Sequence, residues 1–315
     1  MYFGIFDSII RCNRALPELA QAPPDSSPSQ PLNIWFRTPR LLPAATPGIR
    51  LQAWLDGTDR VAQGQRGDLT LIRVRGLADF LVRPAACSVE CRSCPQAPAS
   101  SVRHFLLNQV LPRMISVRDP LVIHASAVAT DHGALALIGP AGCGKSTLAA
   151  SFVLSGADTL IADDSILVRL AGPSPCLVGA YTRSRLRPDS FGALGFDAQS
   201  IHGGIPVGGK HVLEFAPGQR VPSAPMAIRG LFLLHQAPSD QQSIEVWHLT
   251  GTAAVIALIK NSFLLAPSDH DLLRRQFEAA TALIRTGCPC YALTYPKRFA
   301  DLPHVRDRIL TVLGH

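Results

Sequence analysis

The stretch Gly139-Pro140-Ala141-Gly142-Cys143-Gly144-Lys145-Ser146-Thr147 decides the fold of this chain. It matches G-x-x-x-x-G-K-[ST], a pattern whose glycines let successive backbone N–H groups turn toward phosphate oxygens. An apolar run, 134–139, precedes it, and 145–155 follows with helical spacing. Strand, glycine loop and helix in this order predict a nucleotide-binding loop for ATP or GTP. We expect Lys145 to contact the outer phosphates and the Ser146 hydroxyl to ligate Mg²⁺.

Two adjacent carboxylates, Asp163 and Asp164, lie in the next apolar segment, 159–170, which is predicted as a strand. In phosphate-binding-loop proteins a carboxylate at this place holds Mg²⁺, directly or through water. A pair allows one residue, Asp163, to bind the metal and the other, Asp164, to accept the proton of an incoming hydroxyl. An ordinary acidic strand end is the alternative interpretation.

The rest of the chain divides into two predicted domains. Residues 1–118 are predicted as a small α+β domain, with a helix over 102–117 that Pro112 interrupts. Its expected strands are 32–36, 50–56, 69–76, 78–84 and 88–93. Residues 119–315 are predicted as an α/β domain built around the phosphate-binding loop. Its other expected strands are 121–130, 176–181, 211–216, 228–235 and 244–249, and its other helices 251–260, 270–286 and 302–313.

Composition excludes several classes of protein. With 47% hydrophobic and 17% charged residues the 315-residue chain is not disordered. The net charge is +7, but no block of basic residues resembles a nucleic-acid-binding tail. No apolar run approaches the roughly 20 residues that span a bilayer, and the N-terminus is a poor signal peptide. We therefore expect a cytoplasmic protein without nucleic-acid or membrane partners, whose eight cysteines are thiols or ligands.

Two smaller groups of residues, a set of cysteines and a set of cations, can each be interpreted in two ways. Cys87, Cys91 and Cys94 have the spacing of an iron–sulfur motif but lack a fourth ligand, so ordinary thiols on a strand compete with metal binding. We expect Cys288 and Cys290 to be buried in a strand. Four cations downstream of the carboxylates could hold phosphate or an acidic substrate, or could lie on solvated strand edges. They are Arg183, Arg185, Lys210 and Arg220.

Three segments together resemble the kinase core of the HPr kinase/phosphorylase family: IHASAVAT (123–130), GPAGCGKST (139–147) and IADDSILV (161–168). In that family a histidine lies 21 residues before the loop lysine, as His124 does here. The resemblance implies that Asp164 is the general base toward a substrate serine and that His124 is an active-site residue. It also implies metal binding by Ser146 and Asp163.

Other segments resemble a divergent branch of the same family: FLLNQVLP (105–112), LRPDSFGALG (186–195) and AIRGLFLL (227–234). Members of that branch are often encoded with peptide-modifying systems, including lasso-peptide pathways, which implies a serine of a precursor peptide as acceptor. The family's metal-binding glutamate has no counterpart in 179–187, so the reverse phosphorylase reaction stays open. Family members assemble as hexamers, and a homo-oligomer stays open here.

The sequence therefore predicts a kinase that needs a nucleotide and Mg²⁺ and phosphorylates a serine hydroxyl of a peptide or protein. Transfer to a small hydroxylated molecule is one alternative. A nucleotide switch that hydrolyses or senses a nucleotide without transferring phosphate is the other.

Overall fold

The computed structural model describes residues 1–22, 31–43, 46–53, 60–156, 159–170, 174–181, 183–196, 210–213, 224–235 and 242–314. They form two compact units, Met1–Pro120 with Leu264–Leu272, and Leu121–Phe263 with Leu273–His315. The chain thus first passes between units close to the division at 118/119 expected from the sequence. The segment Leu264–Leu272, which the sequence analysis placed in the second domain, groups instead with the first unit.

The described part of the first unit contains one sheet, in the order β1-β2-β3-β8-β7-β6-β5-β4. β2, β3 and β8 run parallel and the other neighbours antiparallel. Sequence patterns missed β1, β2 and the polar strand β5. The strands are β1 (Tyr2–Ile5), β2 (Ser8–Cys12), β3 (Leu32–Phe36), β4 (Gln52–Ala53), β5 (Val61–Arg66), β6 (Leu69–Val74), β7 (Ala78–Arg83) and β8 (Ser88–Ser93).

One helical segment packs on this sheet through Phe105, whose ring stacks on Phe80 of β7 at 5.6 Å between centroids. The segment consists of α1 (Ala99–Phe105), a π-helical turn (Leu106–Val110) and α2 (Leu111–Ser116). Pro112 lies in the first turn of α2, where its missing N–H costs no hydrogen bond. The interruption expected at Pro112 is therefore the π-helical turn just before it.

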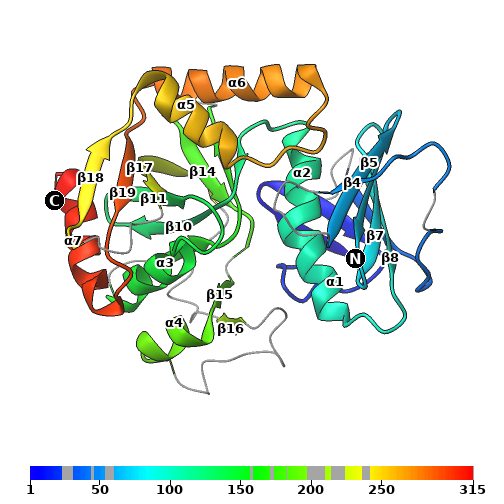
Figure 1. The fold of residues 1–315 in the computed structure, drawn as a ribbon, viewed down its shortest axis with the longest axis horizontal. Helices are drawn as coiled ribbons and strands as arrows, with labels where there is room; N and C mark the ends of the chain where they lie inside the picture. Colours follow the sequence, from blue (N-terminus) through cyan, green and yellow to red (C-terminus); the bar gives the residue numbers. More distant parts are fainter. Residues whose placement is uncertain are drawn as a thin grey trace. The chain divides into compact units, whose positions relative to one another are not determined.

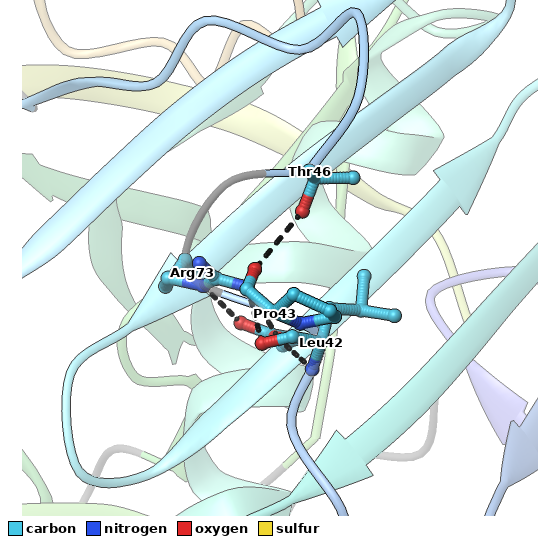
Figure 2. Close-up of polar contacts among 5 residues, drawn as sticks. Leu42, Pro43, Thr46 and Arg73 are labelled. Carbon is cyan, nitrogen blue, oxygen red and sulfur yellow. Dashed lines mark hydrogen bonds and ion pairs between the residues drawn. The ribbon is translucent and has the colours of Figure 1, made fainter.

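A buried ion pair ties β6 to β7. Asp79 is fully buried, and both its oxygens accept hydrogen bonds from Arg73, at 2.7 and 2.9 Å. The same guanidinium donates to the carbonyls of Leu42 and Pro43, and the Leu42 N–H returns a bond to Asp79. Figure 2 shows Arg73 against Leu42 and Pro43, with the Thr46 hydroxyl donating to the Pro43 carbonyl. The pair thereby holds the loop before β4 on the sheet.

In the described part of the second unit, β17 (Met226–Leu234) is the central strand (Figure 1). Its later residues pair in parallel with β11 and β19, and its first residues pair antiparallel with β14. The order across one part is β12-β10-β11-β17-β19-β18, and β14-β13-β9 continues the other. The strands are β9 (Val122–Ile123), β10 (Ala125–Thr130), β11 (Gly133–Ile138), β12 (Thr159–Ala162), β13 (Ile166–Arg169), β14 (Cys176–Gly179), β18 (Glu245–His248) and β19 (Cys290–Thr294).

Both faces of this sheet are covered by helices. Along β11, Leu135 and Leu137 pack into one core and Ala136 and Ile138 into the other, as the period of two in a strand requires. α5 (Gly251–Lys260) and α6 (His270–Arg285) cover the second of these faces. α3 (Lys145–Leu154), α4 (Pro188–Ala193) and α7 (Leu302–Val312) cover the first. The second unit is therefore a layered α/β structure.

The expected strand 159–170 is wrong as a continuous element, because it breaks between β12 and β13. The expected strand 121–130 breaks in the same way, at His124, between β9 and β10. Ala127 pairs with Ala162 and Ile123 pairs with Ile166, so residues 124–126 face 163–165 and the two breaks lie opposite each other. Asp164 adopts φ +77°, a left-handed conformation that ends an extended strand and that Asp tolerates better than most residues.

A separate two-stranded ribbon consists of β15 (Ser184–Leu186), which the sequence analysis missed, and β16 (His211–Leu213). None of the helices in the described parts of the chain is both long and apolar enough to cross a bilayer.

Candidate functional site

The glycine loop joins β11 to α3 in a conformation that needs glycine at two points. Gly139 has φ +150°, and a Cβ there would lie 2.7 Å from the Leu234 carbonyl oxygen. Gly144 has φ +105°, and a Cβ there would lie 2.7 Å from the hydroxyl oxygen of Tyr295. α3 begins immediately afterwards, so its N-terminal N–H groups and positive dipole end point into the loop.

The other loop residues divide between solvent and core. Pro140, Ala141 and Gly142 are exposed, whereas Cys143 is buried with the core residues under α3. The Thr147 hydroxyl donates to Ser190 of α4, at 3.1 Å. Thr147 therefore joins the loop helix to its neighbour.

Lys145 is 6% exposed, and its ammonium donates to the carbonyls of Gly139 and Pro140, at 2.7 and 3.0 Å. Burial lowers its pKa. The loop thus holds a cation beside the N-terminus of α3, where phosphate oxygens would meet both.

Asp163 is the centre of the polar network at the strand breaks. It is 2% exposed, and its two oxygens accept five hydrogen bonds. The donors are the hydroxyls of Ser126, Ser146 (2.9 Å) and Ser184 (2.8 Å) and the backbone N–H groups of Asp164 and Arg185 (both 3.2 Å). One buried carboxylate thereby joins the glycine loop, the strand breaks and the β15–β16 ribbon.

Ser126 and Ser184 were not among the residues selected from the sequence. Ser126 faces Asp163 in the register of β10 and β12, and this pairing was the signal that could have found it. Ser184 arrives from a strand that the sequence analysis missed, and no motif marks it.

Asp164 is held through its backbone. Its carbonyl oxygen accepts a hydrogen bond from His124 Nδ1, at 2.8 Å, which requires the proton of this imidazole to be on Nδ1. Within the described residues the Asp164 carboxylate itself makes no hydrogen bond. The backbone of Asp164 is therefore fixed while its side chain stays available.

His124 is itself fixed from two sides. Its backbone N–H donates to the Asn261 carbonyl, at 2.7 Å. Its ring meets the Phe263 ring edge-on, with 6.0 Å between the ring centroids. Burial lowers the pKa of His124, and the charge of Lys145 lowers it further. A neutral imidazole is thus the stable form, and it orients Asp164.

Of the four candidate cations, Arg185 is placed most firmly, because its backbone N–H donates a hydrogen bond to the Asp163 carboxylate. Burial lowers the pKa of Arg185, and the negative charge of Asp164 acts in the opposite direction. Lys210 is near enough to lower the pKa of Lys145, as a minor contribution. Arg183 is half-buried just before β15. Arg220 lies outside the described residues.

Ser146 and Asp163 fit a Mg²⁺ site, because their oxygens are 2.9 Å apart and Mg²⁺ prefers hard oxygen ligands shared with phosphates and water. The described residues contain no group of three or more His, Cys, Asp or Glu able to hold a metal without such help. All eight cysteines are free thiols. Cys91 and Cys290 are buried in β8 and β19, and burial raises the pKa of Cys91 to about 12, which disfavours a thiolate ligand.

No family model matches the chain, and no curated protein does. Among solved structures, the HPr(Ser) kinase/phosphatase from Coxiella burnetii aligns with 61% of this chain and 99% of its own. The sequence identity is 13% and the TM-score 0.32. These values are too low to transfer the activity of that protein to this chain.

Proposed function

We propose that this protein is a kinase that transfers the terminal phosphoryl group of ATP or GTP to a serine hydroxyl of a peptide or protein. The observation that carries the proposal is the Asp163 carboxylate. It binds the Ser146 hydroxyl of the glycine loop and the backbone of Asp164 at the strand break. Phosphate binding, metal binding and a carboxylate base thus meet within one network.

The glycine loop and Lys145 hold the phosphates of the donor. The N–H groups at the start of α3 add donors and a positive dipole at the same point. Ser146 and Asp163 hold Mg²⁺, which when bound offsets charge on the phosphate oxygens. The four donors that Asp163 has besides Ser146 keep this carboxylate in place.

Asp164 accepts the proton of the acceptor hydroxyl on a carboxylate oxygen. The Asp164 carboxylate suits this role because it is half-buried and accepts no hydrogen bond from the described residues. His124 fixes the Asp164 backbone through Nδ1–H, and its lowered pKa keeps the ring neutral in this role.

The β15–β16 ribbon supplies positive charge for the phosphoryl group or the acceptor. Arg185 is fixed beside Asp163 by its own N–H and by the neighbouring Ser184 hydroxyl. Arg183, Arg185, Lys210 and Arg220 remain the residues we assign to phosphate or substrate contacts. A cytoplasmic location and a homo-oligomer remain predictions.

Intact-mass analysis tests the proposal. The protein is incubated with ATP, Mg²⁺ and a panel of serine-ended peptides and small hydroxylated compounds, with Lys145→Ala as the blank. A gain of one phosphoryl group on a peptide, absent from the blank, is the expected result. A phosphoryl group gained only by a small compound would show that the acceptor is a small molecule and not a peptide. If ATP binds but no compound gains a phosphoryl group, the kinase proposal is wrong and a nucleotide switch takes its place.

A further inference from the structure

The direction of the strands places the carboxylates on one side of the glycine loop. β12 and β11 are both antiparallel to β10, and β11, β17 and β19 are parallel to one another. The carboxyl ends of β12, β11, β17 and β19 therefore share one edge of the sheet. Asp163 and Asp164 lie at the β12 end of this edge, and β17 and β19 continue it beyond the loop.

If the proposed function holds, as this inference assumes, the transferred phosphoryl group points toward Asp164. The rest of the donor then extends from the loop in the other direction, over the ends of β17 and β19. β19 lies two strand spacings from β11, about 10 Å. The residues that directly follow these strands are His235 and Tyr295.

Tyr295 carries a hydroxyl that faces the glycine loop. The residue is 6% exposed, and its hydroxyl oxygen lies against Gly144, at the beginning of α3. Within the part of the chain that the structure describes, this hydroxyl makes no hydrogen bond. Burial raises its pKa, so it keeps its proton and can donate. A phosphate oxygen in the loop would accept a hydrogen bond from this hydroxyl.

A flat aromatic pair lies at the same edge of the sheet but on its other face. Tyr295 and Val246 pack on the core under α3, whereas Trp247 pairs with Ala292, which has the same orientation as Cys290 in the core under α5 and α6. The His235 N–H donates to the Leu293 carbonyl of β19, at 2.9 Å, and its ring stacks on Trp247 with centroids 5.9 Å apart and planes 21° apart. Trp247 lies opposite Ala292 of β19, whose small side chain lets residues from the strands on either side of β19 meet. Trp247 is 44% exposed, a large fraction for a tryptophan.

We propose that the nucleoside of the donor binds over the carboxyl ends of β17 and β19. The Tyr295 hydroxyl donates to the donor's phosphate chain, and the Trp247–His235 pair stacks against the base. Because every base presents a π-face to an aromatic side chain, such a contact accepts either purine.

Calorimetric titration with ATP and with inorganic tripolyphosphate tests this site, because the second ligand lacks the nucleoside. We expect Trp247→Ala to weaken ATP binding about tenfold and to leave tripolyphosphate binding unchanged. Tyr295→Phe should weaken both ligands, also about tenfold. Phe277→Ala is the matched control, because Phe277 is an aromatic residue of α6 that is 53% exposed. It should change neither affinity.

The outcomes separate this inference from the proposed function. Unchanged ATP affinity in Trp247→Ala, or an equal loss for both ligands, would overturn the base contact. Unchanged tripolyphosphate affinity in Tyr295→Phe would overturn the phosphate contact. Wild-type protein that binds neither ligand would overturn the proposed function, and this inference with it.

Discussion

Gly144→Ala should destabilise the second unit for two reasons that can be measured separately. Gly144 has φ +105°, where a side chain costs about 1–2 kcal/mol. The new Cβ would also lie 2.7 Å from the Tyr295 hydroxyl oxygen, and overpacking of this kind costs about 1–3 kcal/mol. The sum is a loss of about 2–5 kcal/mol.

Tyr295→Phe should remove only the second contribution. Without the hydroxyl, the nearest atom to the new Cβ is Cζ of the same ring, at 3.8 Å, an ordinary van der Waals contact. Gly144→Ala should then cost only about 1–2 kcal/mol, so the cycle should show a coupling of about 1–3 kcal/mol. Since its hydroxyl has no hydrogen-bond partner in the described residues, Tyr295→Phe alone should cost little.

The assay is denaturant unfolding of the four proteins, followed by far-UV circular dichroism. Gly142→Ala is the control, because Gly142 has φ +80° and nothing within 4 Å of an added Cβ. It should cost the same in both backgrounds. If Gly144→Ala also costs the same in both, the hydroxyl does not lie against Gly144, and the argument for Tyr295 at the loop is refuted.

Three further predictions follow from the site and the core. Asp164→Asn should keep nucleotide binding and lose transfer by a factor of about 10²–10⁴ in single-turnover experiments, and full activity would rule Asp164 out as the base. Because the pKa of His124 is lowered in the folded protein, the unfolded chain binds the extra proton first as the pH falls below about 6.5. Stability is then lost by up to about 1.4 kcal/mol per pH unit, and His124→Gln should show a smaller difference in unfolding free energy between about pH 7.5 and 5.5. Arg73→Ala should cost about 3–5 kcal/mol by stranding the buried Asp79 charge, whereas loss of the exposed Arg298 pair should cost under about 1 kcal/mol; equal losses would contradict this.

The parts of the site that are local in sequence could be predicted from it. Glycines, a lysine and a serine at fixed spacing specify the loop between β11 and α3, because neighbouring residues alone determine that backbone. The spacing from His124 to the loop and the pair Asp163-Asp164 were equally visible. The structure brings these segments together through the pairing of β10 with β11 and β12.

The rest depends on pairing between distant segments. The strand breaks at His124 and Asp164 were missed because an apolar run on each side resembles one long strand. Ser126 became visible only through the register of β10 and β12, and Ser184 only through the hydrogen bond from its hydroxyl to Asp163. Tyr295 follows β19, a strand that was expected only from the burial of Cys290 and without bounds, and only the parallel pairing with β17 brings the Tyr295 hydroxyl to the loop.

The division of the chain has a consequence for the order of folding during synthesis. The first unit includes Leu264–Leu272, and the Leu265 carbonyl accepts a hydrogen bond from Gln63 of β5. Because the chain emerges from its N-terminus, these residues appear only after the glycine loop and both strand breaks have been made. The first unit therefore cannot be completed before most of the second has left the ribosome. A fragment that stops at Pro120 would lack a piece of its own domain.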